Sequence, residues 1–236
     1  MMLKSMWYGL RVQSSRRAWG RSVLFLMLAT GSARSGAGWA AAPPEDGGMS
    51  RRLAGLRVAI RSLEVTEETT IRDERPGKPA REQRGVRHLI YRVDLGRTRS
   101  ESAGSHPRVE AQRSPPPGWV FELPDMMRGR ECRVRRGPVG PVIAVAAAGA
   151  TNQSSGKPMQ EMELSADRLP VHVLTYGARG EVLDEITVRW RTEGGVPFPG
   201  EIEYRYHSVE NTLIRTVTYR AVRMNSVISA TLFTNP

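Results

Sequence analysis

The chain has 236 residues, with 35 basic and 24 acidic side chains and a formal net charge of +11. Six of the basic residues and none of the acidic ones precede residue 41, so the remainder has a surplus of only five basic residues. Arginine is scattered there among Asp and Glu rather than gathered on one element, which argues against a nucleic-acid-binding protein. The single cysteine, Cys132, excludes an intrachain disulfide.

The first forty residues predict export. A basic head precedes a short apolar run at 23–29, and small residues follow, which is the layout of a signal peptide (1–40). The run is shorter than the roughly 20 residues that a transmembrane helix needs, although a short N-terminal anchor is the alternative. We place the cleavage between Ala40 and Ala41. The paired arginines before the run keep both the Sec and the twin-arginine export routes open.

The next elements are a flexible mature N-terminus (41–49) and a helix that begins the folded domain (50–236). Ser50 is the expected N-cap. Apolar residues recur at steps of three and four, which predicts one buried helical face: Leu53, Leu56, Ile60 and Leu63.

Strands are predicted after this helix. Two are placed at 63–71 and 86–94, the second with Leu89, Tyr91 and Val93 on one face. Residues 102–118, rich in Pro and Gly, are expected to form a loop. A short strand is predicted at 119–123, and the apolar run 139–148 fits either a buried strand or a short helix.

The pattern from Met159 onward predicts a β-meander. Strands are expected at 170–176, 186–191, 201–206 and 213–224, separated by Gly- and Pro-containing turns. A change of parity between Tyr219 and Val222 predicts a β-bulge. Short turns make neighbouring strands antiparallel. One face is apolar and aromatic while the other is charged, so we expect a curved sheet with a covered apolar face.

This meander resembles a known family. The residues that carry the resemblance are Asp167–Pro170, Tyr176–Gly180, Ile186–Trp190, Gly195–Pro199, Tyr219–Asn225 and Leu232–Phe233. Together they resemble the C-terminal half of the outer-membrane lipoprotein-sorting proteins, the LolA-like periplasmic carriers. The helix and strand at 50–71 also fit the start of that family, whereas the middle third does not match it.

The resemblance implies an α+β, mainly β fold, in which a curved antiparallel half-barrel sheet is covered by helices and loops. It also implies a soluble periplasmic carrier that binds lipoprotein acyl chains or lipid, with transport partners at the inner or outer membrane. In the family an arginine on an early strand helps to hold the closed state, and Arg99 is the nearest match, followed by Arg97. An RseB-like envelope-stress sensor that binds a membrane protein is the alternative. Such sensors usually carry a second domain, and we expect none because the chain stops at Pro236.

Aromatic residues are the candidate contacts for an acyl chain. Each fits either the plain core of the sheet or the lining of an apolar cavity, because the inner face of a half-barrel serves as both. The candidates are Trp119, Trp190, Tyr204, Tyr206 and Tyr219.

Catalysis, cofactors and metals are not expected. The four histidines lack the paired spacing of a zinc helix, and the Glu pairs at strand spacing fit alternating surface charge. Neighbouring arginines would lower the pKa of an exposed Cys132 thiol, but no positioned base is identifiable in the sequence.

Overall fold

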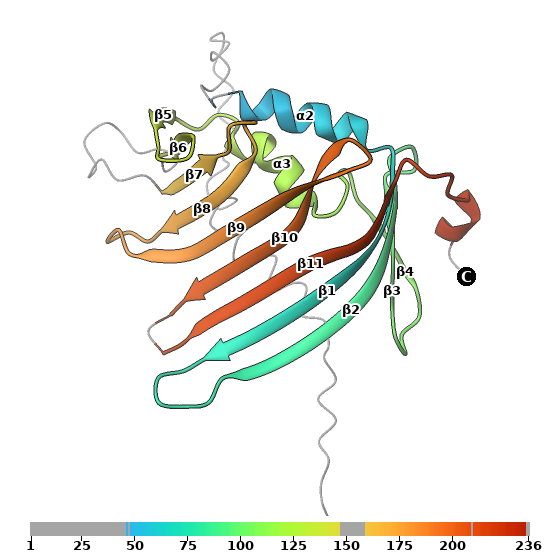
Figure 1. Cartoon of the computed structure of the whole chain (residues 1–236), viewed down its shortest axis with the longest axis horizontal. Helices are drawn as coiled ribbons and strands as arrows, with labels where there is room; N and C mark the ends of the chain where they lie inside the picture. The colour runs from blue at the N-terminus through green and yellow to red at the C-terminus, as the bar shows by residue number, and fades with distance from the viewer. Residues whose placement is uncertain (1–45, 47, 147–158, 209, 235–236) are drawn as a thin grey trace, which may run out of the picture. The chain divides into compact units, whose positions relative to one another are not determined.

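The computed structural model describes residues 46, 48–146, 159–208 and 210–234 (Figure 1). They belong to one compact unit, Ala41–Pro236. The predicted signal peptide and its cleavage site between Ala40 and Ala41 lie outside the described residues. Within the described ranges, no helix has the length and apolar character required to cross a bilayer.

Two α-helices, a short 3-10 helix and eleven strands make up the described part of the chain. The helices are α2 (Met49–Ala59), α3 (Gly118–Met127) and η1 (Ala230–Phe233). The strands are β1 (Ser62–Glu74), β2 (Arg81–Arg92), β3 (Arg97–Ser102), β4 (Arg108–Ala111), β5 (Cys132–Arg136), β6 (Pro141–Val145), β7 (Gln160–Leu164), β8 (Pro170–Tyr176), β9 (Val182–Glu193), β10 (Val196–His207) and β11 (Thr212–Met224).

All eleven strands form one antiparallel sheet, in the order β4-β3-β2-β1-β11-β10-β9-β8-β7-β6-β5. Strands adjacent in the sequence pair with each other, except β4 and β5, which lie at opposite edges. β1 also pairs with β11, so the first and last strands meet in the middle. The sheet ends at β4 and β5 and is therefore not closed. Both edge strands are short and carry arginines, which discourages pairing with another chain. Figure 1 shows α2 and α3 together at one end of the long strands, while the other end extends beyond them.

Alternation along the strands separates an inner face from an outer face. The inner face is buried and mainly apolar, and includes Leu63, Val65, Leu89, Tyr91, Val188, Ile202 and Val217. The outer face carries cross-strand ion pairs, among them Arg220–Glu68 at 2.8 Å, Arg189–Glu201 at 2.6 Å and His172–Glu185 at 2.8 Å. Exposed pairs of this kind contribute about 0–1 kcal/mol each. Burial of the inner face therefore stabilises the fold far more than the charges outside it.

Helix α2 confirms the predicted apolar spacing but not the predicted cap. Leu53, Leu56 and Ile60 are buried. The N-cap is Gly48, so Ser50 lies inside the first turn, and the Asp46 carboxylate accepts the N–H groups of Gly48 at 2.9 Å and Ser50 at 2.8 Å. The helix ends at Ala59 rather than at residue 63, because from Ser62 onward the backbone pairs with β2 and β11 instead.

Helix α3 occupies the segment 119–123 that we predicted as a strand, and that prediction was wrong. Val120, Leu123 and Met127 recur at helical spacing and are buried. A five-residue apolar run carries too little periodicity to distinguish the two structures. Pro124 lies inside the helix, where it removes a backbone donor, and no side chain caps the N-terminus. Packing of its apolar side chains therefore matters more to α3 than its own hydrogen bonds.

The middle of the chain holds more strands than predicted. Residues 102–118 include β4, which pairs with β3. The run 139–148 forms β6, between β5 and β7, and its residues 147 and 148 lie outside the described part. Val93 follows the end of β2 and is 43% exposed, so it does not share the buried face of Leu89.

The C-terminal meander is confirmed. Its predicted strands correspond to β8, β9, β10 and β11. The bulge is confirmed as well, because Ala221 adopts a φ of 49° where the pairing of β1 with β11 shifts between Glu64 and Thr66. The predicted class, a mainly β fold built on one open antiparallel sheet with helices against its inner face, is the observed one.

Candidate functional site

The inner face beneath the two helices is a packed core. Several of its side chains have no accessible surface at all, including Leu53 of α2, Met162 of β7 and Ile202 of β10. A side chain that lined a cavity large enough for water would retain accessible surface. These positions are therefore filled by the protein's own side chains, and a ligand can reach them only if a helix moves.

Beside the packed core lies a strip of three aromatic side chains, Trp119, Tyr204 and Tyr206, which we call the aromatic strip. Trp119 of α3 donates its indole N–H to the Tyr204 hydroxyl at 2.8 Å, with the ring centroids 6.1 Å apart. Tyr206 stacks on Tyr204, with centroids 6.3 Å apart and an interplanar angle of 1°. All three side chains are only partly buried. Burial raises the pKa of both tyrosines, so their hydroxyls stay protonated at neutral pH.

A buried ion pair lies on the same face. The Glu67 carboxylate, in a residue that is 3% exposed, accepts two hydrogen bonds from Arg87, Nε to Oε1 at 2.6 Å and Nη2 to Oε2 at 2.9 Å. Glu67 is directly opposite Tyr219 of β11. Burial, with a contribution from the charge of Glu67, raises the pKa of Tyr219. A carboxylate at this depth needs a cation beside it, and Arg87 provides one.

The five aromatic candidates do not form one cluster. Trp119, Tyr204 and Tyr206 lie together in the strip. Tyr219 is 2% exposed and packs edge-on against Phe198, with centroids 5.5 Å apart. Trp190 lies elsewhere and donates its indole N–H to the Pro170 carbonyl at 2.7 Å. Contact of these side chains with lipid stays a prediction.

The two arginines that we considered for holding a closed state both bind the C-terminal segment. Arg97 donates to the carbonyl of Phe233 at 3.2 Å, and Arg99 donates to that of Leu232 at 2.7 Å. Arg99 also pairs with Glu101 at 2.7 Å. The Phe233 side chain is buried. The segment that these arginines hold is therefore η1, and a role in locking a lid stays a prediction.

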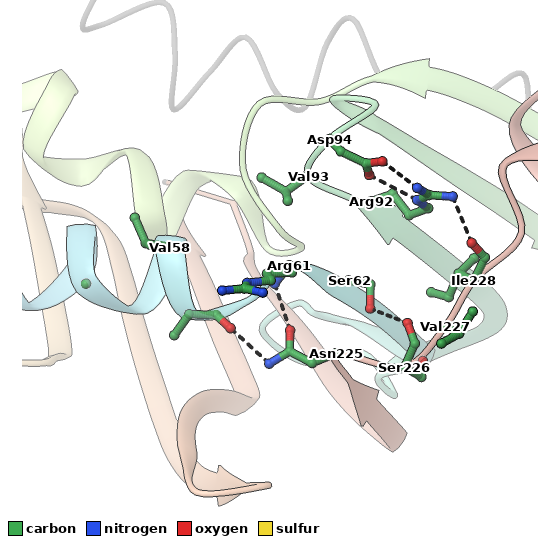
Figure 2. A pocket seen from close by; sticks show the side chains of 12 residues that line it. Val58, Arg61, Ser62, Arg92, Val93, Asp94, Asn225, Ser226, Val227 and Ile228 are labelled. Atoms are coloured by element: carbon green, nitrogen blue, oxygen red, sulfur yellow. Dashed lines mark hydrogen bonds and ion pairs between the residues drawn. The ribbon is translucent and has the colours of Figure 1, made fainter.

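A groove of about 720 Å³ lies between the C-terminal end of α2 and the segment after β11 (Figure 2). At its floor the Asn225 side chain accepts from the Arg61 N–H at 2.8 Å and donates to the Ala59 carbonyl at 3.0 Å. Arg92 is held by Asp94 and by the Ile228 carbonyl, as Figure 2 shows. These polar groups already have partners, so the groove acts as a junction that fixes the C-terminal segment to the sheet.

Side chains that could bind a metal ion are not gathered anywhere in the described ranges. They contain no cluster of three or more His, Cys, Asp or Glu side chains that could hold a metal ion. Burial raises the pKa of the Cys132 thiol despite the nearby charge of Arg130. The thiolate that a nucleophile requires is therefore disfavoured.

Sequence reasoning missed the charged residues of the inner face. Alternation from Leu63 through Val65 places Glu67 on the apolar face, and the same parity along β11 places Arg215 with Val217 and Tyr219. That signal was available in the sequence. The sequence did not reveal the partner of Glu67. Arg87 lies 20 residues away, and whether it faces Glu67 depends on the register of β2 against β1, which the length of the connecting turn sets.

Comparison with known proteins concerns the fold. No protein-family model matches the chain, and no curated protein matches its sequence. A DUF1329 family protein from Desulfovibrio piger superposes with a TM-score of 0.51 at 9% identity, over 81% of this chain and 98% of that one. Two further structures each give a TM-score of 0.44. They are a LolA superfamily protein from Nitrosomonas europaea, at 11% identity over 80% of this chain and 97% of that one, and an outer membrane lipoprotein-sorting protein domain from Vibrio parahaemolyticus, at 13% identity over 79% and 94%.

At these identities the likeness shows a shared fold and nothing about ligands. The architecture expected from the sequence, one open antiparallel sheet with covering helices, is the observed one, and this chain shares its fold with the DUF1329 family protein.

Proposed function

We propose that the chain is a non-catalytic periplasmic carrier that binds the acyl chains of a lipoprotein or a lipid against the inner face of its sheet. One observation carries the proposal: the inner face passes from a packed apolar core into a partly exposed aromatic strip, and the sheet around it is open. The carrier domain begins with α2, at Met49 rather than at residue 50, and follows a signal peptide at 1–40. It exchanges its cargo with partners at the inner and outer membranes.

Energetics support an exchange between α3 and an acyl chain. Four side chains of α3 are buried, Val120, Phe121, Leu123 and Met127. Each contributes about 1.5–3 kcal/mol, so the helix gains roughly 6–12 kcal/mol from its packing. An acyl chain with about 14 methylenes gains roughly 11 kcal/mol at about 0.8 kcal/mol each. The two quantities are similar, so a bound chain can replace α3 on the inner face and α3 can displace the chain again.

Two adjacent residues of β11 allow a matched test. Leu213 pairs with Tyr206 on the inner face, and Ile214 pairs with Arg205 on the outer face. Both side chains are partly buried. We expect the delipidated full-length protein to bind the uncharged apolar probe N-phenyl-1-naphthylamine. Leu213→Glu should weaken binding about tenfold, since it places a charge against the acyl site at a cost of about 1.4 kcal/mol or more. Ile214→Glu should not change binding.

Absence of probe binding by the delipidated wild-type protein would refute the carrier. So would an equal loss in both variants, because the loss would then be unrelated to the face of the sheet. No contact or comparison described above favours the RseB-like sensor, and we do not propose it.

A further inference from the structure

One row of inner-face side chains crosses most of the sheet. Each member lies directly opposite the next on the neighbouring strand, in the order Ile71, Arg215, Tyr204, Ile186, Val173, Met162 and Ile143. The far end of the row is fully buried, whereas the side chains of Ile71, Arg215 and Tyr204 are partly exposed. Arg215 is the only charged member of this row. It lies where the apolar surface meets solvent.

Arg215 has no carboxylate partner among the described residues, which distinguishes it from its neighbours. Every other arginine of β9, β10 and β11 pairs with a carboxylate: Arg189, Arg191, Arg205, Arg220 and Arg223. The guanidinium carbon of Arg215 lies 5.6 Å from the centroid of the Tyr204 ring. Its Nε–H is buried and has no acceptor. An aromatic ring attracts a cation but offers no in-plane oxygen for this donor.

The nearby acids do not serve Arg215. Both oxygens of Glu67 accept hydrogen bonds from Arg87, and the charge of Glu67 is thereby paired. Asp184 lies in the adjacent row, opposite Tyr206. Arginine cannot lose its proton in a protein, and a partly buried cation with an unused donor is costly. An anion held by Arg215 would remove that cost, because guanidinium binds carboxylate or phosphate through two parallel hydrogen bonds.

We propose that the cargo of this carrier is an anionic lipid, whose carboxylate or phosphate headgroup binds Arg215 and whose acyl chain follows the apolar row toward Ile143. This inference rests on the carrier function proposed above and adds the charge of the cargo to it. The row from Arg215 to Ile143 comprises five strand spacings, or about 24 Å. An acyl chain spans about 15 Å in one leaflet of a bilayer, so the row is long enough. The uncharged acyl anchor of a lipoprotein would leave Arg215 unpaired.

Probes with the same chain and different heads test the inference. We would titrate the delipidated full-length protein with cis-parinarate, which is anionic, and with its uncharged methyl ester. The wild-type protein should bind cis-parinarate about tenfold or more tightly than the ester, the scale of one charge-assisted hydrogen bond. Arg215→Gln should lose this preference and bind both probes as the wild type binds the ester. Arg215→Lys, which keeps the charge but not the planar fork, should retain part of it. Arg220→Gln, on the outer face of the same strand, should behave as the wild type.

The outcomes separate the two proposals. Equal binding of both probes, or a preference that survives in Arg215→Gln, would overturn the anionic cargo and leave the carrier intact. Failure of the wild-type protein to bind either probe would overturn both. Inorganic phosphate that displaces cis-parinarate as effectively as an alkyl phosphate of the same chain length would show a simple anion site, which also contradicts the inference.

Discussion

If α3 is the element that an acyl chain displaces, a weaker contact between α3 and the sheet should strengthen binding. Trp119→Phe removes the indole N–H that donates to the Tyr204 hydroxyl at 2.8 Å and keeps an aromatic ring in its place. The Tyr204 hydroxyl then loses its partner in the closed state, whereas in the open state water can replace that partner.

The size of the effect follows from a single hydrogen bond. A typical intramolecular hydrogen bond contributes about 0.5–1.5 kcal/mol to stability. A change of about 1 kcal/mol alters an equilibrium constant roughly fivefold. The apparent Kd equals the intrinsic Kd divided by the fraction of protein in the open state. Trp119→Phe should therefore lower the apparent Kd for an acyl probe about fivefold, provided that the open state is the minor one.

Trp190→Phe is the matched control, because it removes an equivalent hydrogen bond, to the Pro170 carbonyl at 2.7 Å, in which no residue of α3 takes part. Both variants should lower the Tm by about 2–4 °C, as expected for a loss of about 1 kcal/mol in a chain of this size. Only Trp119→Phe should bind the probe more tightly in a fluorescence titration. An unchanged Kd in Trp119→Phe, together with a lower Tm, would show that α3 is not the lid.

Three further predictions concern stability. Arg87→Met leaves the Glu67 carboxylate buried without a cation and should lower the free energy of unfolding in urea by about 3–5 kcal/mol. The double variant Arg87→Met/Glu67→Leu should recover most of this stability. An equal loss of stability in the single and double variants would contradict a buried charge pair. Burial raises the pKa of Asp184 above 3.8, so its contribution to stability is complete below that pH and is lost as the pH rises through the folded-state pKa. Asp184→Asn should therefore raise the Tm at neutral pH but not below pH 3.8, and a benefit that does not depend on pH would contradict this. Asn225 adopts a φ of 56°, and its side chain makes two hydrogen bonds that both Asn225→Ala and Asn225→Gly would remove. Asn225→Ala should lower the Tm more than Asn225→Gly, because only glycine tolerates that φ without strain. The opposite order would show that backbone conformation does not matter there.

The C-terminal half of the fold was predictable because its pattern is local. Ile186, Val188 and Trp190 alternate strictly with polar residues, and so do Ile202 and Tyr204. Such alternation has only one structural solution when one face is buried. The parity change after Tyr219 was equally visible, and the bulge lies there.

The rest depended on contacts that no local pattern encodes. α3 is stabilised by the burial of Val120 and Met127 in the hydrophobic core, and its short apolar run alone does not distinguish helix from strand. The pairing of β1 with β11 joins segments about 150 residues apart, and it places Glu67 opposite Tyr219. The sequence shows Arg215 on an apolar face, but only the register shows that its neighbours are Ile71 and Tyr204.

Mass spectrometry of lipids extracted from the purified protein would test the carrier most directly. The full chain should be expressed with its N-terminal segment, recovered from the periplasm without detergent, and compared with its Leu213→Glu variant. We predict that the wild-type protein carries acyl-containing molecules in amounts comparable with the protein and that the variant carries far fewer. Traces at the same low level in both proteins would contradict the claim that the inner face holds an acyl chain.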